Sequence, residues 1–330
     1  MRSQNVIALN ICASAVLFGV FLLRLFVRYH HKTWKQISKG WLLSDVLVAI
    51  AIFLAISCSV LDSWIRFAKM DMEERMAGPV PESPVELVAL IRDGRLLKED
   101  ALQVAFYNQI AFVSLLWSIK TSFIISYLGM AQFLSRLLRL ALYSSTVLLG
   151  LTYIAMMLIL TLWCRPITTN WSSDSSQYCS AQTNGTQTII FYILHLGTDI
   201  PVLTLPIFIL RTLRLGTGEK YALAFVYILG VLTIVVTTTR FVFHLQYARM
   251  YQDGEIADMF KSLEKIYLVS LAEVFASGVL VCLPSMRVLL RTLLRAAGIL
   301  TVSEKTTTDQ EGITEDGFEM IHTSKSKFES

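Results

Sequence analysis

Seven stretches of this 330-residue chain are long and apolar enough to cross a lipid bilayer, and they constrain the fold more than any other feature. The hydrocarbon core is about 30 Å thick and a helix rises about 1.5 Å per residue, so a span needs about 20 mostly apolar residues. Lipid offers the backbone no hydrogen-bond partner, so each stretch should be a helix. The sequence therefore predicts an all-α, seven-transmembrane helix bundle in one domain, residues 1–300, with spans at 5–27, 41–61, 104–128, 139–163, 188–210, 221–245 and 263–283.

The composition supports lipid as the solvent for most of the chain. Apolar residues make up 54% and charged residues 16%, whereas soluble domains have about 45–50% and about 25%. A disordered chain, a secreted disulfide scaffold and a coiled coil are excluded on this ground. The sequence also has no phosphate-binding glycine loop, no metal-binding His/Cys cluster and no nucleophile elbow. We therefore expect no enzyme activity, no metal and no nucleic-acid partner.

Lysine and arginine are concentrated in alternate connections between the spans. Four segments hold twelve cations and, apart from Glu219, almost no acids: Arg28, Lys32, Lys35, Lys39, Arg136, Arg139, Arg211, Arg214, Lys220, Arg287, Arg291 and Arg295. The other connections are mixed or acidic, above all residues 62–103. By the positive-inside rule the N-terminus is outside and the C-terminus is cytosolic.

The connection 164–187 carries two signs of an extracellular location. Asn170 and Asn184 each begin a glycosylation sequon, Asn170-Trp171-Ser172 and Asn184-Gly185-Thr186. Cys164 and Cys179 lie in the same loop, where an oxidising compartment favours a disulfide that would pin the loop over the helix mouths. The alternative is two free thiols and unused sequons.

The long connection 62–103 contains one predicted helix. Ser83, Pro84 and Glu86 have the spacing of a capping box with proline at the first helical position, and Gly94 offers a C-cap. We expect a short amphipathic helix lying across the extracellular face. It would serve either as a lid over a ligand pocket or as a packed linker.

The segment after the seventh span separates into two parts. Arg287, Arg291 and Arg295 recur every four residues and share one face of a predicted interfacial helix, 285–298, whose basic face would meet anionic lipid headgroups. Residues 301–330 are rich in serine, threonine and acids and should form a disordered cytosolic tail.

Five ionisable residues fall inside the predicted spans and are functional candidates, because charge is costly in lipid. They are Asp45, Lys120, Asp199, Arg240 and Glu273. Their depths along the helices predict an inner cluster of Asp45, Lys120 and Asp199 and an outer pair of Arg240 and Glu273. Three interpretations remain open: the pairs only fix helix register, they rearrange when a ligand binds outside, or an acid titrates in a proton-coupled transporter.

Histidines and lysines in the spans give no sign of a cofactor. His195 and His244 are isolated in the sequence and are interpreted as satisfied interior residues. Retinal needs a lysine deep in the last helix, but Lys265 lies at its outer end and Glu273 occupies its middle. We expect no retinal and no other cofactor.

Several motifs, in order, resemble one family, the fungal rhodopsin-domain integral membrane proteins (Pth-like receptor candidates), from about residue 20 to residue 291. The motifs are Arg24 and Arg28 before Gly40-Trp41-Leu42-Leu43-Ser44-Asp45, Lys120-Thr121-Ser122 with Tyr127, Trp163-Cys164-Arg165-Pro166 with Trp171 and Cys179, Thr198-Asp199-Ile200 with Leu205-Pro206, Thr239-Arg240, and Glu273 with Leu283-Pro284-Ser285-Met286-Arg287. Two departures are visible: Ser44 replaces the first of two adjacent aspartates, and no cysteine-rich domain precedes the first helix. The acid–arginine pair of animal receptors is also absent after Ser126.

The resemblance implies a receptor-like, multi-pass fungal protein whose family supplies a class and little mechanism. We expect a plasma-membrane protein, embedded in the lipid bilayer, that senses an unknown extracellular small molecule or peptide between helices three, five, six and seven. It would signal to a cytosolic partner such as a G-protein α subunit. The alternatives are a small-solute or proton-linked transporter, which the lack of an internal repeat disfavours, and a membrane scaffold for a biosynthetic pathway.

Overall fold

Seven long helices form the structure, a computed structural model that describes residues 3–31, 39–77, 84–128, 135–172, 174, 178–180, 183–212, 217–253 and 256–282. The helices are α1 (Ser3–His31), α2 (Lys39–Ala77), α3 (Pro84–Leu128), α4 (Arg136–Leu162), α5 (Gly185–Thr212), α6 (Thr217–Asp253) and α7 (Ile256–Cys282), with a short 3₁₀ helix, η3 (Ile167–Trp171), after α4. All seven are long and apolar enough to cross a membrane, and the described residues contain no strand. The predicted all-α, seven-helix bundle is confirmed. The predicted interfacial helix 285–298, with Arg287, Arg291 and Arg295, and the tail 301–330 lie outside the described residues.

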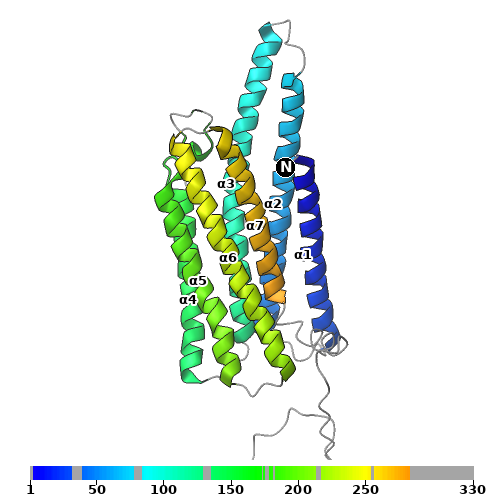
Figure 1. Cartoon of the computed structure of the whole chain (residues 1–330), viewed down its shortest axis with the longest axis vertical. Helices are drawn as coiled ribbons and strands as arrows, with labels where there is room; N and C mark the ends of the chain where they lie inside the picture. Colours follow the sequence, from blue (N-terminus) through cyan, green and yellow to red (C-terminus); the bar gives the residue numbers. More distant parts are fainter. Residues whose placement is uncertain are drawn as a thin grey trace, which may run out of the picture.

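The helices run alternately up and down, so each connection lies at one of two ends of the bundle (Figure 1). We call the end that carries Cys164 and Cys179 the disulfide end, and the other the opposite end. Helix α1 begins at the disulfide end and α7 finishes at the opposite end. Consecutive residues of α3, α5 and α7 therefore descend from the disulfide end, whereas those of α6 ascend toward it.

Helices α2 and α3 project beyond the other helices at the disulfide end (Figure 1). They contain 39 and 45 residues, which at about 1.5 Å per residue is about 60 and about 70 Å, twice the thickness of the hydrocarbon core. The expected short helix does begin at Pro84, but Gly94 lies inside α3 instead of ending it. A glycine inside a helix costs only about 1 kcal/mol relative to alanine, and good helix formers follow it. The predicted helix across the extracellular face is therefore wrong, since the segment continues α3 away from the bundle.

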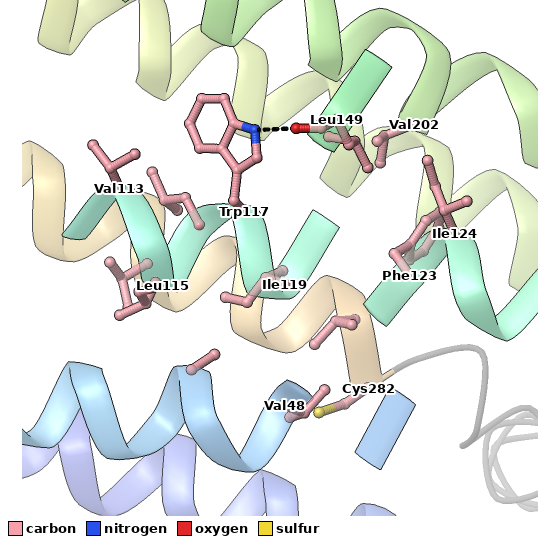
Figure 2. Packing of buried hydrophobic residues seen from close by; sticks show 14 of the residues in the cluster. Val48, Val113, Leu115, Trp117, Ile119, Phe123, Ile124, Leu149, Val202 and Cys282 are labelled. Atoms are coloured by element: carbon pink, nitrogen blue, oxygen red, sulfur yellow. Dashed lines mark hydrogen bonds between the residues drawn. The ribbon is translucent and has the colours of Figure 1, made fainter. Parts of the chain in front are cut away.

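Helix α3 is the centre of the bundle. In its best membrane-spanning window 67% of residues are buried, against 17–28% in the other six helices. Leu115, Leu116 and Ile124 are almost fully buried, and the Trp117 indole donates a hydrogen bond to the Leu149 carbonyl of α4 at 3.1 Å (Figure 2). The polar side chains of Lys120, Ser122 and Ser126 in this part of α3 consequently face protein rather than lipid.

The outer surfaces of the helices carry large apolar side chains. Phe53 is 70% exposed, Leu137 78% and Leu151 62%. Such surfaces would be a liability in water and are what a lipid-facing helix requires. The packing thus agrees with a multi-pass membrane protein.

Candidate functional site

Lys120 lies deep in α3 and joins it to α5. Its ammonium nitrogen is 2.8 Å from Asp199 Oδ1 and donates hydrogen bonds to Thr198 Oγ1 at 2.8 Å and to the His195 carbonyl at 3.2 Å. The same nitrogen is 4.8 Å from the centre of the Trp117 ring. Because Lys120 is only 6% exposed, these contacts replace the water that its charge has lost.

Glu273 lies in the middle of α7 and is 1% exposed. Its Oε2 is 3.1 Å from Arg240 Nη1 of α6, and its Oε1 accepts a hydrogen bond from Thr237 Oγ1 at 2.9 Å. The Arg240 guanidinium also lies 4.4 Å above the Phe112 ring of α3. The carboxylate therefore ties α7 to α6, and its partner arginine reaches α3.

His195 connects these two ion pairs. Its Nε2 is 3.2 Å from Glu273 Oε1 and 3.4 Å from Asp199 Oδ2, so one imidazole nitrogen lies between two carboxylates. With His195 neutral, Lys120 and Arg240 balance Asp199 and Glu273. We call these five residues the ion network. Removal of any one charge would leave another buried without its counter-ion.

This role of His195 differs from the prediction of an isolated, satisfied interior residue. The available signal was spacing: His195 and Asp199 are four residues apart and share one face of α5. The structure brings Lys120 and Asp199 together, and Arg240 and Glu273 together, as their depths suggested.

Asp45 does not join Lys120, and its place in the predicted inner cluster is corrected. Its Oδ1 is 3.0 Å from Arg24 Nε of α1. Arg24 is fully buried, donates to Ser44 Oγ at 2.9 Å and also donates to the Val281 carbonyl near the end of α7. Depth alone suggested Lys120, but α1 lies beside α2 and supplies a closer cation, Arg24, which was not among the five predicted buried charges.

Three serines extend this second cluster into α3. Ser44 Oγ lies 2.8 Å from Ser122 Oγ and 3.0 Å from Ser126 Oγ, and Ser122 Oγ donates to the Ser44 carbonyl at 2.9 Å. We call Arg24, Asp45, Ser44, Ser122 and Ser126 the arginine–serine junction. It joins α1, α2, α3 and the end of α7 in the half of the bundle toward the opposite end.

A cavity lies between α3, α4, α5 and α6 on the disulfide-end side of the ion network. We call it the aromatic cavity; its empty space, open mouth included, is about 580 Å³. Tyr192 and Phe241 stack in its wall with ring centres 4.0 Å apart. His195 and Arg240 belong both to its wall and to the ion network. The lining is Gln109, Phe112, Val113, Leu116, Trp117, Met156, Thr188, Phe191, Tyr192, His195, Thr237, Arg240, Phe241 and His244.

A second cavity lies on the other side of the ion network, between α3, α5, α6 and α7. Lys120 and Asp199 line it together with residues nearer the opposite end, including Tyr227, Ser277 and Val281. Helices α5 and α6 approach closely here, since a Cβ on Gly230 would clash with the side chain of Leu203. We call it the opposite cavity. The ion network is thus the partition between two cavities.

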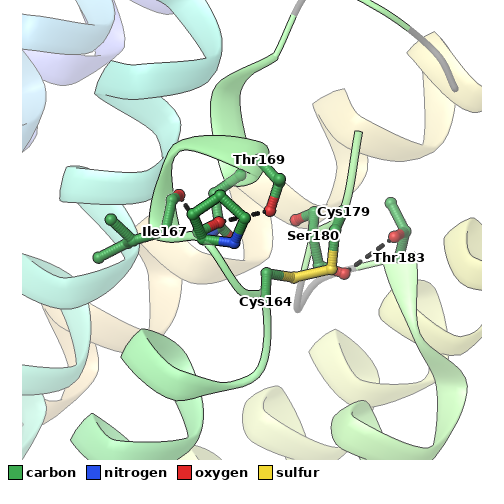
Figure 3. Close-up of a disulfide and its surroundings, with 8 residues drawn as sticks. Cys164, Ile167, Thr169, Cys179, Ser180 and Thr183 are labelled. Atoms are coloured by element: carbon green, nitrogen blue, oxygen red, sulfur yellow. Dashed lines mark hydrogen bonds between the residues drawn. A yellow bond between two sulfur atoms is a disulfide. The ribbon is translucent and has the colours of Figure 1, made fainter. Parts of the chain in front are cut away.

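Cys164 and Cys179 form the predicted disulfide, which is confirmed. The Cys179 amide donates to the Thr169 carbonyl at 3.0 Å. This hydrogen bond and the disulfide, which Figure 3 shows, close the loop on itself. Trp171, at the end of η3, packs against Phe106 of α3 with ring centres 5.6 Å apart. One side of the loop is therefore fixed to α3.

Tyr178 fixes the other side of the loop. Its ring lies 6.2 Å from that of Tyr251 near the end of α6. Burial raises the pKa of the Tyr178 phenol, so the group is neutral at physiological pH. The loop therefore reaches from α3 to α6, two of the helices that line the aromatic cavity.

The two sequon asparagines have different surroundings. Asn170 is 4% exposed and its side-chain nitrogen donates to the Ile167 carbonyl at 3.0 Å, so a glycan there would break this contact. Asn184 caps α5, because its Oδ1 accepts from the amides of Thr186 at 3.0 Å and Gln187 at 3.4 Å. Its side-chain nitrogen is the atom a glycan would use, so the folded loop favours Asn184 over Asn170 as the acceptor.

The comparisons with known proteins agree with this architecture. The family model of the fungal rhodopsin domain matches residues 23–292, which include the last part of α1, all of α2 to α7 and every member of the ion network. No curated protein matches the chain. No solved structure matches it either. Within the described residues, no group of three or more His, Cys, Asp or Glu side chains is arranged to hold a metal ion.

Proposed function

Because the chain belongs to the fungal rhodopsin domain family, we propose that it is a receptor-like membrane protein that binds a small ligand in the aromatic cavity. The observation that carries this proposal is the double membership of His195 and Arg240. Both line the cavity and both hold the buried carboxylates of the ion network. A ligand that contacts either side chain therefore changes the balance of the network directly.

The change in the ion network would reach the opposite end through the side-chain contacts of Glu273, His195 and Arg24. When Arg240 turns to a ligand, Glu273 keeps only Thr237 and His195. His195 also touches Asp199, whose partner Lys120 lines the opposite cavity. Movement of α7 with Glu273 would in turn act on its last turn, where Arg24 holds the Val281 carbonyl.

The proposed orientation places the disulfide end outside the cell, in the plasma membrane. The twelve cations of the basic segments then lie in the cytosol, as the positive-inside rule requires, and the disulfide lies in an oxidising compartment. A cytosolic partner such as a G-protein α subunit would read the opposite end. No catalytic step is part of this proposal.

A proton-linked transporter is the second candidate, and the opposite cavity favours it. A carrier needs access to its ionisable group from both sides, and Asp199 faces the opposite cavity while His195 faces the aromatic one. Asp199→Asn separates the two candidates. It would abolish solute flux in a carrier, whereas a receptor would show altered signalling and no flux in either form.

Proximity labelling from the C-terminal tail in living hyphae tests the proposal. The variants are Lys120→Met and, as a matched control, Lys265→Met, which removes a lysine of α7 outside the network. Enrichment of a G-protein α subunit at the cell surface that is altered by Lys120→Met and retained by Lys265→Met would support a receptor. Labelling dominated by biosynthetic enzymes on internal membranes, equal in all forms, would overturn the proposal and favour a scaffold.

A further inference from the structure

The ionisable side chains in the wall of the aromatic cavity, as the structure describes it, are basic groups and a phenol, without a carboxylate among them. Among the described residues that line it they are Arg240, His195, His244 and the phenol of Tyr192, and no carboxylate lines it. Glu273 and Asp199 do not line the cavity; they lie in the ion network, in contact with Arg240 and His195. An arginine and two imidazoles that face an apolar space offer N–H donors to an anion and no carboxylate to a cation.

The other residues of the wall favour an anion whose remaining part is flat and apolar. Phe112, Trp117, Phe191 and the stacked pair of Tyr192 and Phe241 present aromatic faces and edges. Aromatic walls of this kind pack best against a flat, apolar group. The polar head and the apolar body of the ligand would be next to each other, because Arg240 itself lies 4.4 Å above the Phe112 ring.

From these observations, and resting on the proposed function, we infer that the ligand of the aromatic cavity is a small aromatic monocarboxylic acid, bound as its anion together with one proton. The carboxylate pairs with Arg240 and takes the place of Glu273. The proton goes to the imidazole of His195.

Charge balance in a buried site gives the reason for the proton. In the free protein, Lys120 and Arg240 balance Asp199 and Glu273. A bound carboxylate adds a third negative charge, and a net buried charge is costly. His195 is the group placed to compensate, since its Nε2 touches both carboxylates and an imidazole can carry an added proton as a cation.

The charged and titratable groups around His195 come from three neighbouring helices and its own. They are Lys120 on α3, Asp199 on α5, Arg240 and His244 on α6, and Glu273 on α7. Protonated His195 would lie between Glu273, freed from Arg240, and Asp199. Three cations then balance three anions. Binding of the ligand therefore converts His195 from its neutral to its protonated form.

The experiment uses the full-length protein in lipid nanodiscs with two probes of nearly the same shape. Benzoate carries the charge, and nitrobenzene is its neutral isostere. Titration calorimetry in two buffers of different ionisation enthalpy gives the number of protons taken up. We expect benzoate to bind with uptake of about one proton, and its affinity to fall about tenfold for each unit of pH increase over the range in which that proton is taken up. Nitrobenzene should bind without proton uptake and without pH dependence.

Three variants locate the effect. His195→Gln retains a hydrogen-bonding side chain but no titratable one, and should lose the proton uptake. His31→Gln, the control, changes a histidine at the last residue of α1, a helix none of whose described residues lines the cavity, and should retain it. The double variant Arg240→Gln/Glu273→Gln removes both members of one ion pair, so the network stays balanced; it should lose benzoate binding and keep nitrobenzene binding.

The outcomes separate this inference from the proposed function. Binding of nitrobenzene without binding of benzoate would overturn the acid as ligand and leave a ligand cavity in place. Benzoate binding without proton uptake, or with uptake unchanged in His195→Gln, would overturn the role of His195. Failure of both probes to bind would overturn the inference and remove the main support for a ligand in this cavity.

Discussion

Replacement of Lys120 by methionine gives the sharpest prediction about the ion network. Methionine has a similar length and fills the same space, so the change removes the charge and the contacts to Asp199, Thr198 and the His195 carbonyl with little effect on packing. Asp199 then stays buried without its cation. Breaking a buried ion pair in this way costs about 3–5 kcal/mol.

The size of the effect can be stated as a shift of the thermal midpoint. In a chain of this size each kcal/mol lowers the midpoint by about 2 °C, so Lys120→Met should lower it by about 6–10 °C. The assay is thermal unfolding of the purified protein in detergent, followed by loss of the monodisperse peak. Lys120→Met/Asp199→Asn should recover at least half of the loss, because the uncompensated charge is gone.

Lys265→Met is the control. Among the contacts of the described residues, the ammonium nitrogen of Lys265 lies 5.8 Å from the centre of the Phe243 ring and forms no ion pair. This variant should move the midpoint by no more than about 1–2 °C, as ordinary surface substitutions do. If Lys120→Met is as mild as Lys265→Met, or if the double variant is worse than the single one, the assignment of Lys120 as the counter-ion of Asp199 is refuted.

Three further predictions concern other parts of the molecule. Serine at Cys164 and Cys179 should lower the stability of the protein by about 2–4 kcal/mol, seen as a lower thermal midpoint, and no change on reduction of the native protein would contradict it. Asn184→Gln should abolish any glycan-dependent shift on a gel while Asn170→Gln leaves it, because the Asn170 side chain is buried; the reverse pattern would show that the loop folds differently. Arg24→Met should destabilise the protein by an amount similar to Lys120→Met and should increase hydrogen exchange at the end of α7, where Arg24 holds a carbonyl; an unchanged exchange rate there would refute that contact.

The number and position of the spans could be predicted from the sequence because lipid thickness fixes the length of an apolar helix. The lengths of α2 and α3 could not. Outside the bilayer no such rule fixes helix length. Gly94 predicted the end of a helix, but the good helix formers that flank it allow α3 to continue through this residue. The relevant physics is helix propensity in water, which tolerates one glycine at modest cost.

The ion network was partly predictable for a similar reason. Depth follows from sequence position, so Lys120 with Asp199 and Arg240 with Glu273 could be matched by level. Depth does not give the identity of the neighbouring helix, and therefore Asp45 was matched with the wrong cation. Arg24 can be identified as the partner of Asp45 only when the structure shows that α1 lies beside α2.

The central claim is that the ion network transmits an event from the aromatic cavity to the opposite end. A group can be placed in the cavity without knowledge of the ligand. Thr188, which lines the cavity, is replaced by cysteine in a protein whose free cysteines Cys12, Cys58 and Cys282 are changed to alanine. The new thiolate reacts with benzyl methanethiosulfonate, forms a disulfide with its benzylthio group and releases methanesulfinate. The same reagent applied to the protein with Thr188 intact is the control.

Hydrogen exchange is then measured along all seven helices. The account predicts altered exchange in the segments that line the opposite cavity, around Gly230 of α6 and Ser277 of α7, and loss of that response in His195→Gln. A response confined to the walls of the aromatic cavity, or one that persists unchanged in His195→Gln, would contradict it.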